Sequence, residues 1–212
     1  FWISKKYVAK RQISQGGGTG RISKKVPKGL DKVIDTQFRF HYDTTLIKKC
    51  PYVITPDAWI QLSYKIHGTS GISAYVLCKQ ELTWRQKIAK WLTGEEFNRY
   101  DYLYASRTVI KNRAYNPSVH GGFYGVDVWA EADKIVRPCL AKGQTAYYEI
   151  VGYLPNGGFI QKKYDYGCVP PNEGEVYTPE KHFKVRIYRV TYTNIDGKVF
   201  EYTPRQVQQW CA

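Results

Sequence analysis

The stretch Tyr64-Lys65-Ile66-His67-Gly68-Thr69-Ser70 lies between two segments that have the pattern of β-strands. Residues 52–63 are extended and partly alternating, and they follow a proline turn, so they predict one strand. Residues 72–77 alternate apolar with small or polar side chains and predict the returning strand. Lys65 is therefore expected between two strands, with a bendable Gly-Thr-Ser turn behind it. Such a hairpin can hold an amine at the mouth of a pocket, but ordinary hairpins with a solvated lysine also have this pattern.

Two amphipathic helices are predicted further along the chain. Residues 81–92 place their apolar side chains on one helical face, and residues 126–140 do the same, with Asp127 as the expected N-cap. The first of these helices carries an aromatic and aliphatic stripe. We expect this stripe to contact the core, with a base-stacking platform as the alternative. The stripe consists of Trp84, Ile88, Trp91 and Leu92.

Strands are predicted at residues 102–110, 146–152 and 183–193 from their β-branched and aromatic content. The turn Asn194-Ile195-Asp196-Gly197 predicts a hairpin that returns through residues 198–202, since Asp-Gly is a strong hairpin signal. Thr203 followed by Pro204 is typical of a helix start. Residues 153–182 are rich in Gly and Pro and predict a long, irregular region.

The composition suits one large domain or one domain with appendages. The chain has 212 residues, 43% of them hydrophobic and 16% aromatic, which is ample for a core. No apolar run approaches the roughly 18 residues that span a bilayer, so no membrane partner is expected. The five cysteines are scattered without a C-x-x-C pair, which argues against zinc and a disulfide framework. They favour a reducing compartment such as the cytoplasm.

The positive charge is concentrated at the start of the chain. The net charge is +14, and residues 1–32 contain nine Lys or Arg and one acidic residue. We interpret residues 1–32 as a basic, Gly-rich leader or linker, with a strand at 1–8 that could end a preceding domain. Residues 33–212 form the main domain in this interpretation. Such a charge distribution favours an anionic polymer as partner, while a solvated tail without a partner is the alternative.

The two ends of the sequence suggest a longer polypeptide. The sequence begins at Phe1 and contains no Met, and the helix predicted from Thr203 has about two turns before Ala212. We therefore expect these residues to be an internal part of a longer chain.

Four short motifs, read in order, resemble those of ATP-dependent RNA ligases. Lys65-Ile66-His67-Gly68 resembles their nucleotidyl-lysine motif, and Ser106-Arg107 resembles a Ser-Arg pair that faces the nucleotide. Glu149-Ile150-Val151-Gly152 resembles their Glu-x-x-Gly strand. The strand that contains Tyr188 resembles their aromatic-centred strand, although Arg189 stands where relatives often have Asp.

The resemblance implies an α+β nucleotidyltransferase fold in which two mainly antiparallel sheets enclose an ATP cleft and helices flank them. Lys65 would attack the α-phosphate of ATP and form lysyl-AMP, the AMP would move to an RNA 5′-phosphate, and a 3′-hydroxyl would displace it. Lysine must be unprotonated to attack, and positive charge nearby favours that form. The implied cofactors are ATP and Mg²⁺ or Mn²⁺, and the implied partner is RNA, including a nicked or broken duplex.

The resemblance also implies a role for each matching residue. His67 and Gly68 would belong to the nucleotide site, and Arg107 would contact a phosphate because its guanidinium presents fixed donors. Glu149 would face the nucleotide sugar or a hydrated metal ion, and Tyr188 would stack on adenine.

The chain departs from the family in its late motifs. The Glu-Gly metal-facing strand and the final Lys-x-Lys strand are not present, which implies a C-terminally incomplete domain. Glu173-Gly174-Glu175-Val176 has superficial similarity to the former, but it stands among prolines and precedes the Tyr188 strand. The alternatives are a DNA ligase or capping guanylyltransferase relative, from which His67 in place of Asp points away, and a non-catalytic RNA-binding module.

Overall fold

The computed structural model describes residues 30–212, except positions 43, 45, 50, 59, 95, 117–123 and 125. The leader before residue 30, with its predicted strand and linker, lies outside the described residues. The remaining chain has an α+β fold, as the sequence predicts.

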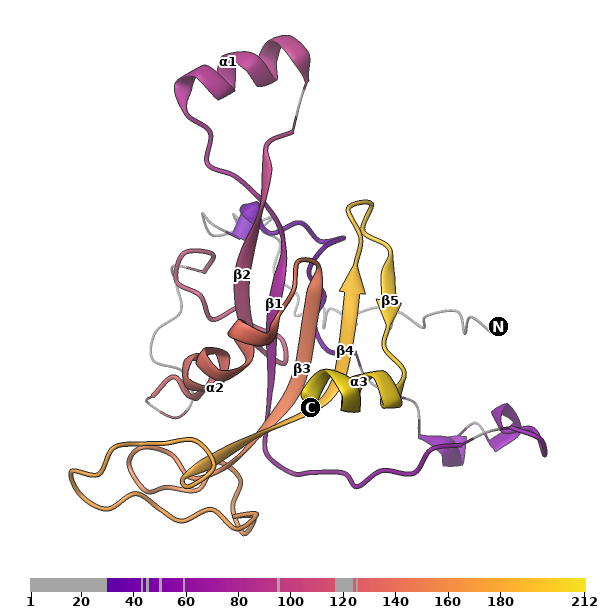
Figure 1. Cartoon of the computed structure of the whole chain (residues 1–212), viewed down its shortest axis with the longest axis vertical. Helices are drawn as coiled ribbons and strands as arrows, with labels where there is room; N and C mark the ends of the chain where they lie inside the picture. The colour runs from indigo at the N-terminus through magenta and orange to yellow at the C-terminus, as the bar shows by residue number, and fades with distance from the viewer. Residues whose placement is uncertain are drawn as a thin grey trace, which may run out of the picture.

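One open sheet of five antiparallel strands organises the described residues, in the order β2-β1-β3-β4-β5 (Figure 1). The strands are β1 (Thr69–Lys79), β2 (Asn98–Ser106), β3 (Gln144–Gly152), β4 (Phe183–Thr193) and β5 (Val199–Glu201). The helices are α1 (Trp84–Thr93), α2 (Val128–Val136) and α3 (Pro204–Cys211). Short 3-10 turns occur at Leu30–Lys32, Ile47–Lys49, Pro51–Val53 and Arg137–Cys139. The resemblance implied two sheets, whereas the residues described here form a single one.

Both faces of this sheet are covered, by different parts of the chain. Neighbouring residues of a strand point to opposite faces, and Tyr147 and Tyr148 of β3 accordingly belong to two separate apolar clusters. On the Tyr148 side, α2 packs on the sheet and α3 contributes Val207. On the Tyr147 side, Phe38 packs against β1 and β2. The N-terminal described segment and the two helices thus enclose the sheet between them.

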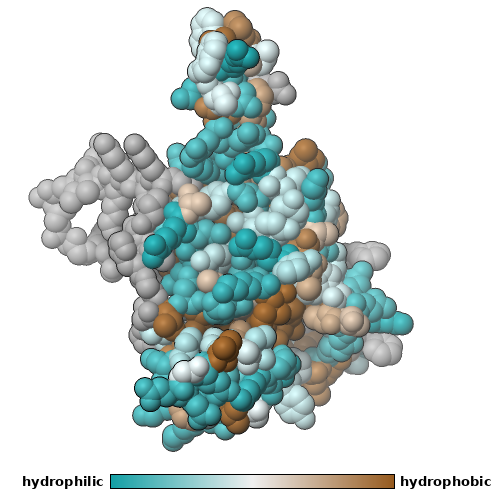
Figure 2. Space-filling view, turned by 60° about the vertical axis from the view of Figure 1, so that its left-hand side comes forward, coloured by the Kyte–Doolittle hydropathy of each residue, from teal (hydrophilic) through white to brown (hydrophobic). Residues whose placement is uncertain are grey.

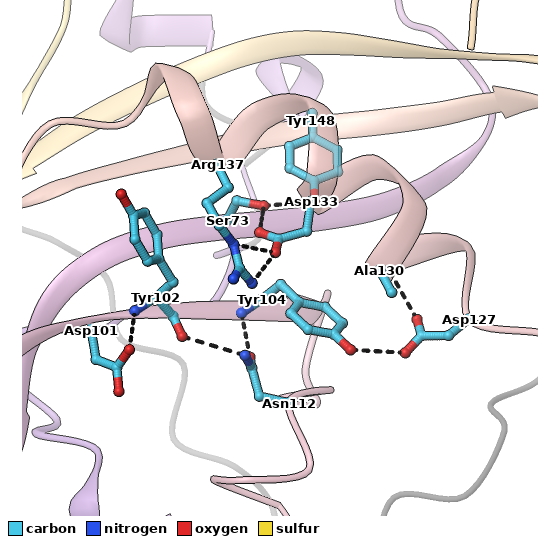
Figure 3. A network of polar contacts seen from close by, with 10 residues as sticks. All are labelled: Ser73, Asp101, Tyr102, Tyr104, Asn112, Asp127, Ala130, Asp133, Arg137 and Tyr148. Atoms are coloured by element: carbon cyan, nitrogen blue, oxygen red, sulfur yellow. Dashed lines mark hydrogen bonds and ion pairs between the residues drawn. The ribbon is translucent and has the colours of Figure 1, made fainter. Parts of the chain in front are cut away.

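Helix α2 is anchored by a network of polar contacts (Figure 3). Asp127 caps the helix as predicted, and its carboxylate accepts a hydrogen bond from the Ala130 amide at 3.1 Å. Asp133 is buried at the centre, where it accepts from the Ser73 hydroxyl at 2.8 Å and from Arg137 Nε at 2.8 Å. Burial raises the pKa of Asp133, although Ser73 and Arg137 act in the opposite direction. The network fixes α2 against β1.

The strand predicted at residues 52–63 is wrong. The described residues there form a 3-10 turn at Pro51–Val53 followed by irregular, exposed chain. Pro56 has no amide hydrogen, and a turn closes here through a hydrogen bond from the Ala58 amide to the Thr55 carbonyl at 3.0 Å. None of the strands among the described residues pairs with this segment. Lys65 therefore precedes one strand, β1, instead of standing between two.

Helix α1 is present as predicted, but its expected core contact is wrong. It lies at the outer end of the arm formed by β1 and β2, beyond the rest of the sheet (Figure 1). Thr83 caps its start with a capping box, Gly94 in the left-handed conformation ends it, and none of its residues is buried. Because the arm carries the helix away from the sheet, its apolar stripe has no core to contact.

The C-terminal predictions are confirmed at the level of elements. Residues 194–197 connect β4 and β5, and Gly197 has the positive φ that such a turn needs. Thr203 forms a capping box with Gln206 at the start of α3. Trp210 of α3 donates to Gln144 Oε1 at 3.1 Å, so the helix is held on β3. None of the helices in the described part of the chain is long and apolar enough to cross a membrane.

Candidate functional site

A cavity of about 1080 Å³ lies where β1 begins, and chain segments distant in sequence meet there. Its lining comes from the irregular segment before β1, the end of β2, the middle of β3 and β4, and the start of α3. Five of the six residues that the sequence singles out line it: Lys65, Gly68, Arg107, Glu149 and Tyr188. The four motifs, which are separate along the chain, therefore meet at one place in the fold.

Gly68 holds the Lys65 segment against β3. Its amide donates to Glu149 Oε1 at 3.1 Å. A Cβ at this position would lie 2.3 Å from the Ile150 carbonyl oxygen and 2.9 Å from Glu149 Cγ, so only glycine permits so close an approach. Lys65, three residues earlier, is exposed at the cavity and contributes positive potential at Glu149.

Glu149 is the only carboxylate among the described residues that line the cavity. In the sheet register it lies between Ser70 of β1 and Arg186 of β4, which form one row across three strands. Burial raises the pKa of the Glu149 carboxyl group. The Gly68 amide, Lys65 and Arg107 offset part of this effect. A carboxylate buried in a strand needs a partner, and Glu149 has a backbone amide and nearby cations.

Arg107 follows directly on Ser106, the last residue of β2. The strand predicted to reach residue 110 ends at Ser106, because the chain turns back there and the Ser106 amide donates to the Val109 carbonyl at 2.9 Å. The turn brings the Arg107 side chain to the cavity. The predicted strand is therefore four residues too long, and Ser106-Arg107 lies at the end of β2.

Tyr188 is half-exposed at the cavity, beside an irregularity in the pairing of β3 with β4 at Tyr147 and Tyr148. Its hydroxyl lies 3.4 Å from Ser70 Oγ and 3.4 Å from His41 Nδ1. The His41 ring contacts it edge-on, with 5.8 Å between ring centroids. Burial raises the pKa of the Tyr188 phenol, so it is uncharged at neutral pH. The ring is held by polar contacts at its hydroxyl end.

His67 is the predicted site residue that does not line the cavity. Its ring packs against Tyr164, with centroids 4.9 Å apart, and its amide donates to the Tyr166 hydroxyl at 2.7 Å. Its role here is to hold the segment before β1 against the long region between β3 and β4. A nucleotide contact by His67 stays a prediction that the geometry does not favour.

Sequence reasoning missed Arg186 and His41, which line the cavity. Arg186 precedes Tyr188 by two residues, and the period-two rule for strands could have placed it on the same face. His41 comes from a segment without strand or helix, and no local signal indicates its position.

The cavity is suited to an anion. Among the described residues, its lining carries Lys65, Arg107 and Arg186 against the single carboxylate of Glu149. Hydroxyl groups of Thr69, Ser70 and Ser106 add hydrogen-bonding capacity. A phosphorylated ligand fits this charge balance, because cations and hydroxyl donors recognise phosphate oxygens.

A divalent ion would find one carboxylate among the described residues of the cavity. Across the described residues, no group of three or more His, Cys, Asp or Glu side chains could hold a metal. Mg²⁺ commonly keeps several waters and uses one or two carboxylates together with substrate phosphates. Glu149 fits that mode, since a nearby cation would favour its charged form against burial.

The acidic motif at Glu173–Val176 has a structural role away from the cavity. Glu175 accepts a hydrogen bond from the Asn172 amide at 3.0 Å and pairs with Lys181. Its carboxylate also lies 3.3 Å from Nε2 of the buried His182. These contacts lower the pKa of Glu175 to about 2, with the Asn172 hydrogen bond as the largest cause. The sequence-based objection to a metal motif here is consistent with this geometry.

No protein-family model matches this chain, and no curated protein or solved structure matches it.

Proposed function

We propose that the chain is the nucleotidyltransferase part of an ATP-dependent RNA ligase, with Lys65 as the nucleophile. The observation that carries this proposal is the meeting of Lys65, Arg107, Glu149 and Tyr188 at one cavity, although they come from four separate segments. A solvated hairpin lysine, the alternative considered for Lys65, gives no reason for that convergence.

The proposed reaction has three steps. The uncharged Lys65 Nζ attacks the α-phosphorus of ATP, a phosphoramidate bond forms as the nitrogen loses a proton, and pyrophosphate leaves with the electrons of the broken P–O bond. The 5′-phosphate of an RNA then attacks lysyl-AMP, which frees the lysine and gives an RNA with a 5′-adenylate. Finally an RNA 3′-hydroxyl attacks that 5′-phosphate, the phosphodiester forms and AMP leaves.

Each cavity residue has a part that its position supports. Arg107 and Arg186 are suited to phosphate oxygens, because guanidinium groups offer several fixed donors and a permanent charge. The half-exposed ring of Tyr188 offers a face for adenine. Glu149 would hold hydrated Mg²⁺ or Mn²⁺, or the ribose. A bound metal would supply charge compensation on the phosphates. The exposed position of Lys65 leaves its amine accessible to ATP.

Covalent labelling tests this proposal. The protein, with Mg²⁺ and radiolabelled ATP or GTP, should acquire a covalent AMP label that survives denaturing electrophoresis and alkali but is released by acid, and no GMP label. Lys65→Arg should acquire none, because the guanidinium is a poor nucleophile. Its unfolding midpoint should match that of the wild type, since Lys65 is exposed. A GMP label would instead favour a capping guanylyltransferase, and the absence of any label would favour a non-catalytic RNA-binding module. A labelled Lys65→Arg protein would exclude Lys65 as the nucleophile.

A further inference from the structure

Helix α1 presents an apolar side that nothing in the described chain covers. Trp91 is 82% exposed, and Trp84, Ile88 and Leu92 are exposed beside it on the same side of the helix. Figure 2 shows hydrophobic atoms at the outer end of this arm, away from the body of the molecule. An exposed cluster of this kind, at the tip of a projecting arm, marks an interaction site.

Basic side chains border the stripe on both sides. At 100° per residue, Arg85 and Lys87 fall on its two opposite edges. The Arg85 guanidinium lies 5.3 Å from the centroid of the Trp84 ring. The helix contains no acidic residue, and Lys90 on its far side pairs with Glu96 at 2.7 Å. The surface therefore combines indole rings with positive charge, which suits a partner that is both aromatic and anionic.

Strand β1 connects α1 to the cavity. It begins at Thr69, next to Gly68, and it ends at Lys79, with residues 80–83 between it and the helix. At about 3.3 Å per residue, the strand spans roughly 33 Å. Pairing with β2 extends along Gly71–Lys79, so the arm is held in one direction from the sheet. A stacked nucleic-acid strand advances about 3.4 Å per nucleotide, so roughly ten nucleotides would span the length of β1.

We propose that the exposed side of α1 is a docking site for single-stranded RNA, at a fixed distance from the nucleotide cavity. This inference rests on the proposed function, which supplies RNA as the substrate. Unpaired bases would stack on Trp84 and Trp91, and phosphates would lie against Arg85 and Lys87. The two indole rings are seven residues apart, or about 10 Å along the helix axis. They can therefore hold two bases of one strand that are not adjacent.

Paired substitutions test whether the rings act by stacking or only by being apolar. In the full chain, Trp84→Leu/Trp91→Leu keeps apolar bulk but removes the rings, whereas Trp84→Phe/Trp91→Phe keeps aromatic faces. Both pairs lie on the exposed side, so circular dichroism should be unchanged. The probe is a fluorescein-labelled single-stranded RNA of 20 nucleotides, measured by anisotropy. We expect the leucine pair to raise Kd at least tenfold and the phenylalanine pair to stay within about twofold of the wild type.

The same variants separate this proposal from the proposed function. Lysyl-AMP formation should be unchanged in both pairs, since that step needs ATP alone. Absence of RNA binding by the wild type, or equal Kd for the leucine pair, would overturn the RNA site whether or not the label forms. Wild-type protein that binds phosphatidylserine vesicles, or that forms a dimer in sedimentation, without binding the RNA would overturn it in favour of a lipid surface or a second copy. Failure of the wild-type protein to form the AMP label would instead count against the ligase proposal.

Discussion

Replacing Gly68 by alanine tests how closely the Lys65 segment must approach β3. The added Cβ would lie 2.3 Å from the Ile150 carbonyl oxygen, where real contacts are at least 3.0 Å, so the segment must move by about 0.7 Å. The neighbouring atoms are the Ile150 carbonyl oxygen, Val151 Cγ1 at 2.8 Å and Glu149 Cγ at 2.9 Å, and a side-chain rotation cannot move the backbone oxygen away. Such a movement stretches the 3.1 Å hydrogen bond from the Gly68 amide to Glu149.

Two magnitudes follow from this displacement. A hydrogen bond to a charged group contributes about 1.5–3 kcal/mol, and the half-buried position of Glu149 favours the lower end. We therefore expect Gly68→Ala to reduce the free energy of unfolding by about 1.5 kcal/mol. A misplacement approaching 1 Å in a reacting group can slow a reaction about 100-fold. Lysyl-AMP formation in a single turnover should fall by about that factor.

The assay combines urea unfolding with rapid-quench measurement of the AMP label. Gly158→Ala is the matched control, because the nearest atom to its Cβ is the side-chain oxygen of Asn156, at 3.2 Å. This control should keep both the stability and the rate of the wild type. A Gly68→Ala protein with wild-type stability and a wild-type adenylation rate would refute the close-approach argument.

Three other substitutions should separate stacking, charge and burial. Tyr188→Ala should weaken ATP binding by about 1–3 kcal/mol in calorimetry, and Tyr188→Phe should hardly change it, since a ring remains; equal losses would indicate the hydroxyl instead. Glu149→Gln should abolish metal-dependent label formation, and a fully active variant would show that the Glu149 carboxylate has no part in the reaction. The unfolding free energy at pH 7 should be unchanged or higher in this variant, because burial raises the pKa of the native carboxyl group and makes its charged form costly. Arg137→Ala should destabilise the fold by about 2–4 kcal/mol at pH 8, a smaller loss than for a fully buried ion pair because Arg137 is partly exposed. At pH 4 the loss should be smaller still, because the buried Asp133 can take up a proton, and urea midpoints that show the same loss at both pH values would contradict this account.

Local sequence patterns predicted helices, strands and turns correctly where the structure depends on residues that are close together in the sequence. The β-branched and aromatic run before Gly152, the Asp-Gly turn after β4 and the Thr-Pro start of α3 each correspond to an element. These signals work because side-chain burial, turn geometry and capping are satisfied within a few residues.

The features that the sequence did not predict depend on contacts between residues that are far apart in the chain. Residues 52–63 have strand-like composition, but a strand needs a neighbour to accept its backbone hydrogen bonds, and composition does not specify one. The stripe of α1 has the period of a core helix, yet the length of the β1–β2 arm determines whether a core is within reach. His67 matches a motif, but its ring is drawn to Tyr164, almost 100 residues later in the chain.

The order of strands has a consequence for how the protein folds. β1 and β2 are joined through α1, and β4 and β5 through a short turn, so both hairpins can form locally and early. The pairing of β1 with β3 joins Thr69 to Ile150, and closing such a loop is entropically costly and slow. That pairing also brings Gly68 to Glu149. We therefore expect the cavity to be completed in the slowest refolding phase, after most of the β-sheet circular dichroism has returned.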